Sequence, residues 1–135
     1  MHFVDTNILL YAISRRTNEA QKAQQAVALL NEPDLALSAQ VLQEFYVQAT
    51  RASSSSNISH EEAIEFMNPL RRFPIQEITV QLVYAAVAAK VRWRIGYWDA
   101  AIIEAARLLG CRTVYSEDLQ DGQDFDGVRV VNPFR

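Results

Sequence analysis

The first third of the chain alternates short apolar runs with longer segments in which apolar residues recur every three or four positions. Residues 3–4 are apolar and lead through a polar triplet into an apolar stripe over 8–13, which predicts a strand followed by a helix. A second helix is expected over 18–30. Residues 35–37 predict another buried strand, and Ser38 is a suitable N-cap for the helix that follows.

The middle of the chain contains a serine-rich segment and a well-marked helix start. Residues 52–57 have the composition of a loop. Ser59 and Glu62 have the spacing of a capping box, so a helix is expected to begin there. This helix must end before Pro74, which lacks the backbone N–H that a helix interior requires.

A long helix is expected in the second half of the chain, after a short strand over 75–78. Thr79 is suited to cap the start of this helix, and Gly96 is expected to end it. The apolar side chains of the helix are spaced to form one stripe, which we expect to face the core: Val80, Val83, Tyr84, Val87 and Val91.

The last part of the chain predicts one more helix and two strands. Asp99 is expected to cap a helix over 100–109, and residues 113–115 and 128–131 are apolar runs of strand length. Short strands that alternate with longer helices indicate an α/β domain with a mainly parallel sheet.

The composition is that of a single compact domain over residues 1–135. Half of the residues are hydrophobic, and a net charge of -3 argues against both a disordered chain and a strongly basic nucleic-acid binder. Cys111 has no partner for an internal disulfide, and no apolar run approaches the ~20 residues that cross a bilayer. The first residues do not have the pattern of a secretory signal. We therefore expect a cytoplasmic protein without membrane contact.

Acidic residues recur where apolar runs give way to turns or helices: Asp5, Glu44, Asp99 and Asp118. Taken singly, each has an ordinary explanation as a helix cap, an exposed helix residue or a turn residue. Parallel sheets bind ligands beyond the carboxyl ends of their strands, and carboxylates that converge there repel one another unless a cation binds. Oxygen ligands favour Mg²⁺ or Mn²⁺, ions that suit phosphodiester hydrolysis. Two histidines, His2 and His60, are too few for a histidine-rich zinc site.

Four short motifs, in their order along the chain, resemble the PIN domain family: Asp5-Thr6-Asn7, Gln43-Glu44-Phe45, Trp98-Asp99-Ala100 and Ser116-Glu117-Asp118. They spread over essentially the whole chain, whose size is most similar to the VapC-type ribonuclease toxins of toxin-antitoxin pairs. The resemblance implies a three-layer α/β/α domain that cleaves RNA with Mg²⁺ or Mn²⁺. It also implies a protein antitoxin as partner and a homodimer.

The same resemblance implies roles for individual residues. The metal-binding and catalytic carboxylates would be those of Asp5, Glu44, Asp99 and Asp118. Asn7 and Ser116 would support these carboxylates through polar contacts. Asp121 is the alternative, as an additional ligand or as the fourth acid in place of Asp118, and we rank Asp118 above it. Arg15 and Arg16 are expected to contact RNA phosphates, since their helix starts beside the first of the acids.

Other interpretations of the acidic residues remain open. A haloacid-dehalogenase-like phosphatase also uses an early strand-end aspartate, but Asn7 replaces the second acid of that pattern. The pattern also needs a lysine beside a late strand, a position that suits neither Lys22 nor Lys90. A receiver domain would need a similar late lysine. A catalytically inactive PIN-like module that binds RNA without cutting it is the third alternative.

Overall fold

The computed structural model describes residues 1–54 and 57–135, so Ser55 and Ser56 of the predicted loop lie outside the described residues. Within the described chain, the strands are β1 (His2–Val4), β2 (Leu35–Ser38), β3 (Ile75–Gln76), β4 (Thr113–Tyr115) and β5 (Arg129–Val131). The helices are α1 (Thr6–Ala12), α2 (Ala20–Leu30), α3 (Ala39–Ala49), α4 (His60–Met67), α5 (Val80–Trp93) and α6 (Tyr97–Leu108), with 3-10 turns η1 (Thr17–Glu19) and η2 (Asn68–Arg72).

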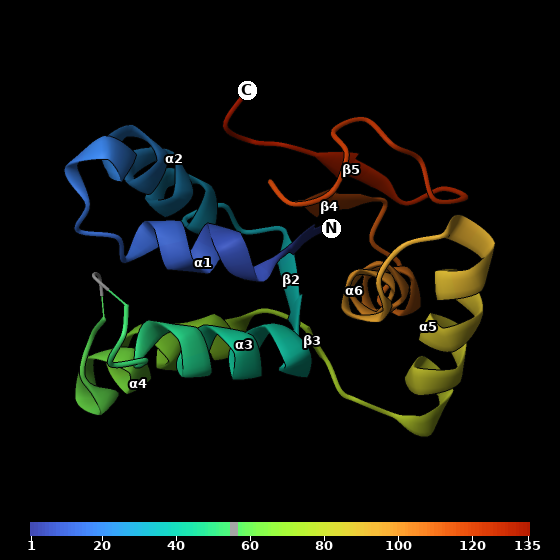
Figure 1. The fold of residues 1–135 in the computed structure, drawn as a ribbon, viewed down its shortest axis with the longest axis horizontal. Helices are drawn as coiled ribbons and strands as arrows, with labels where there is room; N and C mark the ends of the chain where they lie inside the picture. Colours follow the sequence, from blue (N-terminus) through green and yellow to red (C-terminus); the bar gives the residue numbers. More distant parts are fainter. Residues whose placement is uncertain (55–56) are drawn as a thin grey trace.

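The strands form one parallel sheet in the order β3-β2-β1-β4-β5. The chain first builds outward from β1 to β3 and then returns to the other side of β1. Because crossovers between parallel strands are right-handed, this reversal puts the later helices on the opposite face of the sheet. Helices α1 to α4 accordingly lie on one side and α5 and α6 on the other (Figure 1), which confirms the predicted three-layer α/β/α arrangement.

The reversal of strand order occurs between β1 and β4, and this is where the loops after the two strands meet. The two strands pair directly, with Val4 opposite Tyr115, and the backbone N–H of Asp5 donates to the Tyr115 carbonyl over 3.0 Å. Ligands of open α/β sheets bind at such a switch point. The topology therefore brings two of the predicted acidic segments together.

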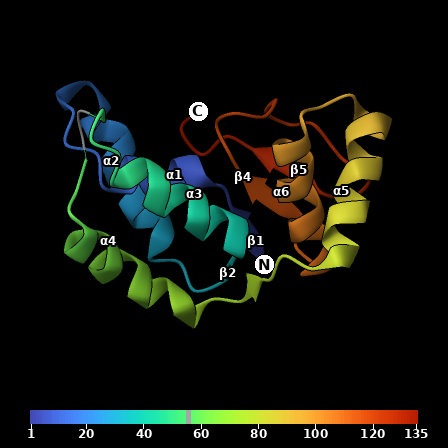
Figure 2. The same ribbon diagram turned by 60° about the horizontal axis from the view of Figure 1, so that its bottom comes forward.

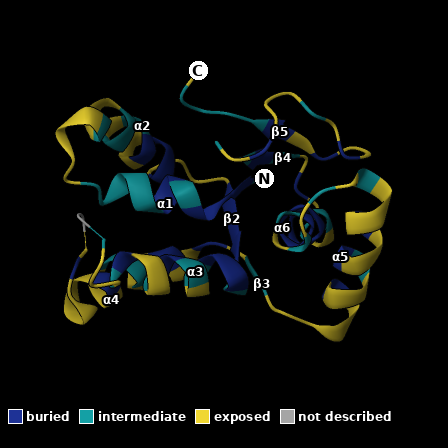
Figure 3. Cartoon of the chain, viewed as in Figure 1, coloured by how far each residue is buried: buried dark blue, intermediate teal, exposed yellow. Residues whose placement is uncertain are grey.

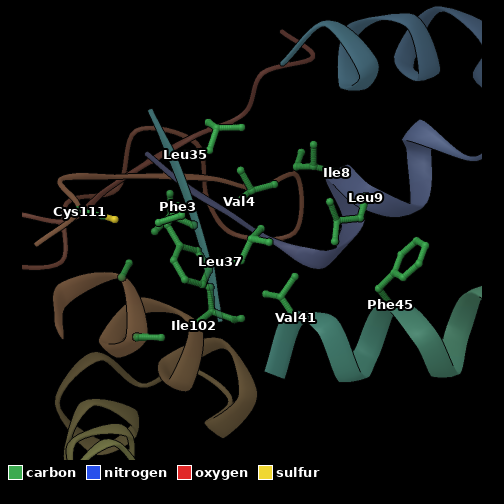
Figure 4. Packing of buried hydrophobic residues seen from close by; sticks show 14 of the residues in the cluster. Phe3, Val4, Ile8, Leu9, Leu35, Leu37, Val41, Phe45, Ile102 and Cys111 are labelled. Atoms are coloured by element: carbon green, nitrogen blue, oxygen red, sulfur yellow. The ribbon is translucent and has the colours of Figure 1, made fainter. Parts of the chain in front are cut away.

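The core fills the space between the sheet and the helices on both of its faces. Phe3, Val4 and Leu37 on the strands are fully buried. Figure 4 shows the side chain of Ile102 on α6 beside the strand that carries Leu37, and the side chain of Phe45 extending from α3 toward α1. Burial of such apolar side chains contributes about 1.5–3 kcal/mol each to folding. The central strands are therefore held on both faces, as their continuous apolar character predicts.

Several helix starts match the predicted capping residues. The Ser38 hydroxyl accepts from the Val41 backbone N–H over 3.2 Å, and Thr79 caps α5 in the same way. Ser59 and Glu62 form the expected capping box at the start of α4. These local hydrogen bonds satisfy N–H groups that the first helical turn cannot pair internally.

The predicted inward orientation of the α5 stripe is wrong. Val80, Tyr84 and Val91 are 74%, 73% and 74% exposed, and Figure 3 shows this side of α5 as largely exposed surface. Helix α5 packs on α6 instead through its opposite side, which buries Leu82, Ala86 and Ala89. Because α5 is apolar around most of its circumference, helical periodicity could not identify the side that faces the domain.

The boundary between α5 and α6 also differs from the prediction. Arg94, in the left-handed region at φ 55°, ends α5, whereas Gly96 is the N-cap of α6. Asp99 is consequently in the first turn of α6 and does not cap it. The strand expected over 75–78 is shorter, since β3 ends at Gln76.

Two further features complete the fold. The helix expected over 18–30 is divided into the turn η1 and helix α2. Over the residues that the structure describes, no helix combines the length and the apolar character needed to cross a bilayer.

Candidate metal-binding acidic site

Asp5 is the most deeply buried of the predicted acids. It follows β1 and caps α1, with 6% of its surface exposed. Its Oδ1 accepts from the Thr6 backbone N–H over 2.7 Å, and its Oδ2 accepts from the Ser116 hydroxyl over 2.7 Å. Burial raises the pKa of Asp5 to about 6, opposed by these two hydrogen bonds and reinforced by the charges of Asp118 and Glu44.

Glu44 reaches the same region from the middle of α3. It is half-buried, and its Oε1 accepts from the Thr6 hydroxyl over 2.8 Å. Thr6 is adjacent to Asp5 and is itself buried. Thr6 thus holds the carboxylates of both Asp5 and Glu44, although these two acids lie far apart in the sequence.

Asp99 enters from the opposite layer, in the first turn of α6. Partial burial raises the pKa of its carboxyl group, and the nearby charge of Asp118 raises it further. The backbone at Gly96 passes close by, since a Cβ atom at that position would lie 3.9 Å from Asp99 Oδ2. The early start of α6 therefore presents this carboxylate to the site.

Asp118 is positioned by polar contacts from α1 and from its own loop. Asn7 donates through Nδ2 to Asp118 Oδ2 over 3.0 Å and to the Ser116 hydroxyl over 3.4 Å. The Asp118 backbone N–H donates to Ser116 Oγ over 3.2 Å. Asn7 and Ser116 therefore connect the loop after β4 to the start of α1.

These carboxylates line one small cavity of about 110 Å³ at the sheet edge, between α1, α3 and α6. The residues around it are Asp5, Thr6, Asn7, Leu10, Gln40, Glu44, Gln48, Trp98, Asp99, Ile102 and Asp118. The structure thus brings together four acids that lie far apart in the sequence. The charge of Asp118 raises the pKa of both Asp5 and Asp99, and the charge of Glu44 raises the pKa of Asp5.

Three polar residues of this cavity were not predicted as site residues from the sequence: Thr6, Gln40 and Gln48. Gln40 and Gln48 lie four positions before and after Glu44, which places all three on one side of α3. Gln40 also donates through Nε2 to the Trp98 carbonyl over 3.3 Å, joining α3 to the start of α6. The four-residue spacing of polar side chains was the signal that could have identified the two glutamines.

The donor set of the cavity suits a hard divalent cation. All four charged groups supply oxygen, and the ion pairs among the described residues do not include any of them. Among the residues that the structure describes, no three His, Cys, Asp or Glu side chains are arranged closely enough to hold an ion by themselves. Mg²⁺ commonly binds one or two carboxylates and keeps several waters, a mode that these residues fit.

Two neighbouring acids point elsewhere. Asp121 accepts from the Asn132 backbone N–H over 2.9 Å and pairs with Arg135 at 3.9 Å, so it is not part of the cavity lining. Glu117 forms close contacts with Lys22 and with the Tyr11 hydroxyl. The contact with Lys22 lowers the pKa of Glu117, with the Tyr11 hydrogen bond acting in the same direction against burial. The structure therefore places Asp118 with the other acids.

A second, larger cavity of about 410 Å³ lies beside the acidic one and shares Asn7 and Asp118 with it. Arg16 and Arg51 are among its lining residues. Arg15 lines neither cavity and pairs with Glu62 at 2.9 Å. Since α1 ends at Ala12, the two predicted arginines lie in the segment after the helix and diverge.

Comparisons with known proteins bear on the family and the fold of the chain. The family model described as PIN domain matches residues 2–125. No curated protein matches the chain.

Several solved structures share the fold. One is VapC20 of Mycobacterium tuberculosis, described as a sarcin-ricin loop cleaving toxin, with 18% identity, 87% of this chain and 90% of that chain covered, and a TM-score of 0.66. A chain of a toxin-antitoxin complex from Klebsiella pneumoniae has 24% identity, 98% coverage of both chains and a TM-score of 0.70. FitAcB from Neisseria gonorrhoeae has 19% identity, 99% coverage of both chains and a TM-score of 0.71.

Proposed function

The chain belongs to the PIN domain family, and from this we propose that it is a Mg²⁺- or Mn²⁺-dependent endoribonuclease, the toxin of a toxin-antitoxin pair. The observation that carries the proposal is the convergence of Asp5, Glu44, Asp99 and Asp118 on one cavity from four separate segments. If these acids had only a structural role, nothing would favour placing four mutually repelling carboxylates around one partly buried space. A site for a cation and a phosphodiester explains it.

The protein residues would act by binding and orientation. Asp5 and Asp118 are held by Ser116 and Asn7, and Glu44 is held by Thr6, so the carboxylate oxygens are fixed before substrate arrives. A divalent cation held by these oxygens would lower the pKa of a water molecule and offset charge on the scissile phosphate. Preorganised carboxylates on rigid elements favour this chemistry because little reorganisation is required.

The surroundings of the acidic cavity supply contacts for single-stranded or structured RNA. Trp98 lines the cavity beside Asp99, is 67% exposed, and packs edge-to-face with Tyr97 at a ring separation of 4.9 Å. A base can stack on such a ring. Arg16 and Arg51 in the adjoining cavity supply positive charge for the phosphates that flank the cleaved bond.

The proposal includes partners and location. The similar Klebsiella pneumoniae structure is a toxin-antitoxin complex, which supports a protein antitoxin for this chain. We propose in addition a homodimer that works in the cytoplasm on RNA, without a membrane partner. The single cysteine, Cys111, is buried and free, which is compatible with a reducing compartment.

The alternative phosphatase interpretation has no specific support from the site. Lys22 is paired with Glu117 and is not among the residues that line the acidic cavity, nor is Lys90. To attack phosphate as a nucleophile, Asp5 would also have to break the two hydrogen bonds that hold its carboxylate oxygens. Trapping of a phosphoaspartate at Asp5 would nevertheless favour that mechanism over direct RNA hydrolysis.

RNA cleavage by purified variants tests the proposed function. Asp5→Asn and Asp99→Asn should each reduce metal-dependent cleavage by at least about 100-fold, because each removes a charge from the cavity. Glu65→Gln is the control, since Glu65 is an exposed acid on α4 outside the cavity. Undiminished cleavage by folded Asp5→Asn protein would contradict the proposal. Mn²⁺ binding by the wild type without cleavage of any RNA would support the inactive binding module.

A further inference from the structure

Lys22, on α2, closes a triangle of polar side chains with Glu117 and Tyr11. Its ammonium group contacts Oε1 of Glu117, and the Tyr11 hydroxyl donates to the other carboxylate oxygen, Oε2. Lys22 also donates to the Tyr11 hydroxyl over 3.4 Å. We call these three side chains the lysine triangle. Both carboxylate oxygens of Glu117 are thus occupied by groups from α1 and α2.

Two aromatic rings fix the ammonium group of the lysine triangle. Lys22 Nζ lies 4.9 Å from the centre of the Tyr11 ring and 5.6 Å from the centre of the Phe134 ring. The two rings pack edge-to-face with their centres 5.0 Å apart. In Figures 1 and 2, α1 and α2 lie side by side, and the C-terminal segment after β5 ends near them. Because aromatic faces attract cations, Lys22 is held from several sides at once.

Glu117 directly precedes Asp118, and the two side chains leave the loop after β4 in different directions. The Asp118 carboxylate accepts from Asn7 and lines the acidic cavity, whereas Glu117 lines only the larger one. The Glu117 backbone N–H donates to Asn7 Oδ1 over 3.4 Å. The loop is therefore held on the side of the acidic cavity by Asn7 and on the side of α2 by the lysine triangle.

From these contacts, we infer that Lys22 is a positioning residue for the acidic site: it holds Glu117 beside α1 and α2 and so directs Asp118 into the acidic cavity. Lys22 lines neither cavity, so it acts through Glu117 and has no contact with the ion or the RNA. It also neutralises a carboxylate that would otherwise add to the repulsion among the four acids. The inference rests on the proposed function, which places a divalent cation in that cavity.

The sign of the effect on cation binding distinguishes positioning from a simple charge effect. A lysine that acted only through its positive charge would repel a nearby cation, so its removal would tighten Mn²⁺ binding. Removal of a positioning residue should weaken Mn²⁺ binding, because Asp118 is then less well placed. The side chains of Lys22 and Glu117 are 38% and 25% exposed, so their ion pair adds little to the stability of the fold.

Calorimetric titration of the full chain with Mn²⁺ measures this effect. Lys22→Met keeps most of the aliphatic side chain but removes its charge, and it should weaken Mn²⁺ binding about 10-fold, a loss typical of residues that orient metal ligands. Lys90→Met is the matched control, since Lys90 is the other lysine of the chain, is exposed and lines neither cavity. Unchanged or tighter Mn²⁺ binding by Lys22→Met, or an equal loss in Lys90→Met, would overturn the inference.

A double-mutant cycle tests whether Lys22 acts through Glu117. Once Glu117→Gln has removed the partner charge, the addition of Lys22→Met should change the Kd for Mn²⁺ by less than about 2-fold. A further loss of about 10-fold in the double variant would show that the two residues act independently, and it would overturn the inference.

The inference and the proposed function can fail separately. A wild type that binds Mn²⁺ and cleaves RNA, with Lys22→Met unchanged in both respects, would refute the role of Lys22 alone. A wild type that binds Mn²⁺ but cleaves no RNA, with the expected loss of Mn²⁺ binding in Lys22→Met, would refute only the nuclease proposal. A wild type that binds no Mn²⁺ would refute both.

Discussion

The Thr6 hydroxyl donates to Glu44 Oε1 over 2.8 Å and so connects the first turn of α1 to the middle of α3. The neighbouring residue, Asp5, accepts from the Thr6 backbone N–H over 2.7 Å. Thr6 therefore contacts two of the four carboxylates without carrying charge. In this structure it is a positioning residue for the acidic cavity.

Removal of the Thr6 hydroxyl should affect activity more than stability. We expect Thr6→Val to reduce kcat for RNA cleavage by about 10-fold. The free energy of unfolding should fall by only about 1 kcal/mol, the usual contribution of one hydrogen bond. Thr6→Ser keeps the hydroxyl and should retain most of the activity. Equal activity of the two variants would show that the contact with Glu44 does not matter for cleavage.

Asp5 should make the protein less stable as the pH rises. Its pKa is raised from 3.8 to about 6 in the folded state, so between these values the folded protein binds more protons than the unfolded chain. The stability contributed by protonated Asp5 is present below pH 4 and is lost as the pH rises through 6, by about 3 kcal/mol in total. Asp5→Asn should therefore be more stable than the wild type at pH 7, but not at pH 4.

Chemical denaturation at several pH values in the presence of a chelator measures this difference. The comparison of wild type with Asp5→Asn removes the effect of other titrating groups that both proteins share. A stability difference that is the same at pH 4 and pH 7 would show that Asp5 is not held in an environment that disfavours its charge.

Divalent cations should reverse this destabilisation. A cation that binds only the folded protein adds about 2.7 kcal/mol when its concentration is 100 times Kd. In scanning calorimetry, Mn²⁺ should therefore raise the Tm of the wild type and of Glu65→Gln by several degrees. Asp5→Asn and Asp99→Asn should show a much smaller rise, and equal rises in all four proteins would place the ion outside the acidic cavity.

A pair of variants distinguishes the two candidates for the fourth acid. Asp118→Asn should lower kcat by at least about 100-fold, since Asp118 lines the cavity. Asp121→Asn should alter kcat by less than about 3-fold, because Asp121 binds Asn132 and Arg135 on an exposed segment. The opposite result would assign the site role to Asp121.

Trp98 should act on RNA binding. Trp98→Ala is expected to raise KM by about 10-fold, in line with the 1–3 kcal/mol of a base–aromatic stack, with kcat within a few-fold of the wild type. Trp98→Phe keeps an aromatic face and should retain most of the affinity. If the two variants bind RNA equally well, stacking on Trp98 makes no contribution.

Much of the fold was predictable because it depends on local signals. Ser38 and Thr79 cap helices with side chains that can only act on the next turn, and the strands 3–4 and 35–37 are short apolar runs between such helices. Alternation of these elements predicts a parallel sheet. The positions of Asp5 and Asp118 after strands then follow from the chain order alone.

The sequence could not decide the orientation of elements with more than one apolar side or more than one possible start. The valines of α5 have helical spacing, yet they face outward because α6 contacts the side with Leu82, Ala86 and Ala89. Likewise, Asp99 lies in a first helical turn because α6 starts at Tyr97, after a cap at Gly96. Both outcomes depend on how α5 and α6 pack together.

By itself, the sequence determined which acids stand at the ends of elements, since a change from apolar to capping residues is a local property. The tertiary structure alone decided that Thr6, Gln40 and Gln48 join them and that Asp121 does not, because distances between side chains are set by packing of helices from different layers. It also decided that one side of α5 stays uncovered, since a single domain offers that apolar surface nothing to pack against.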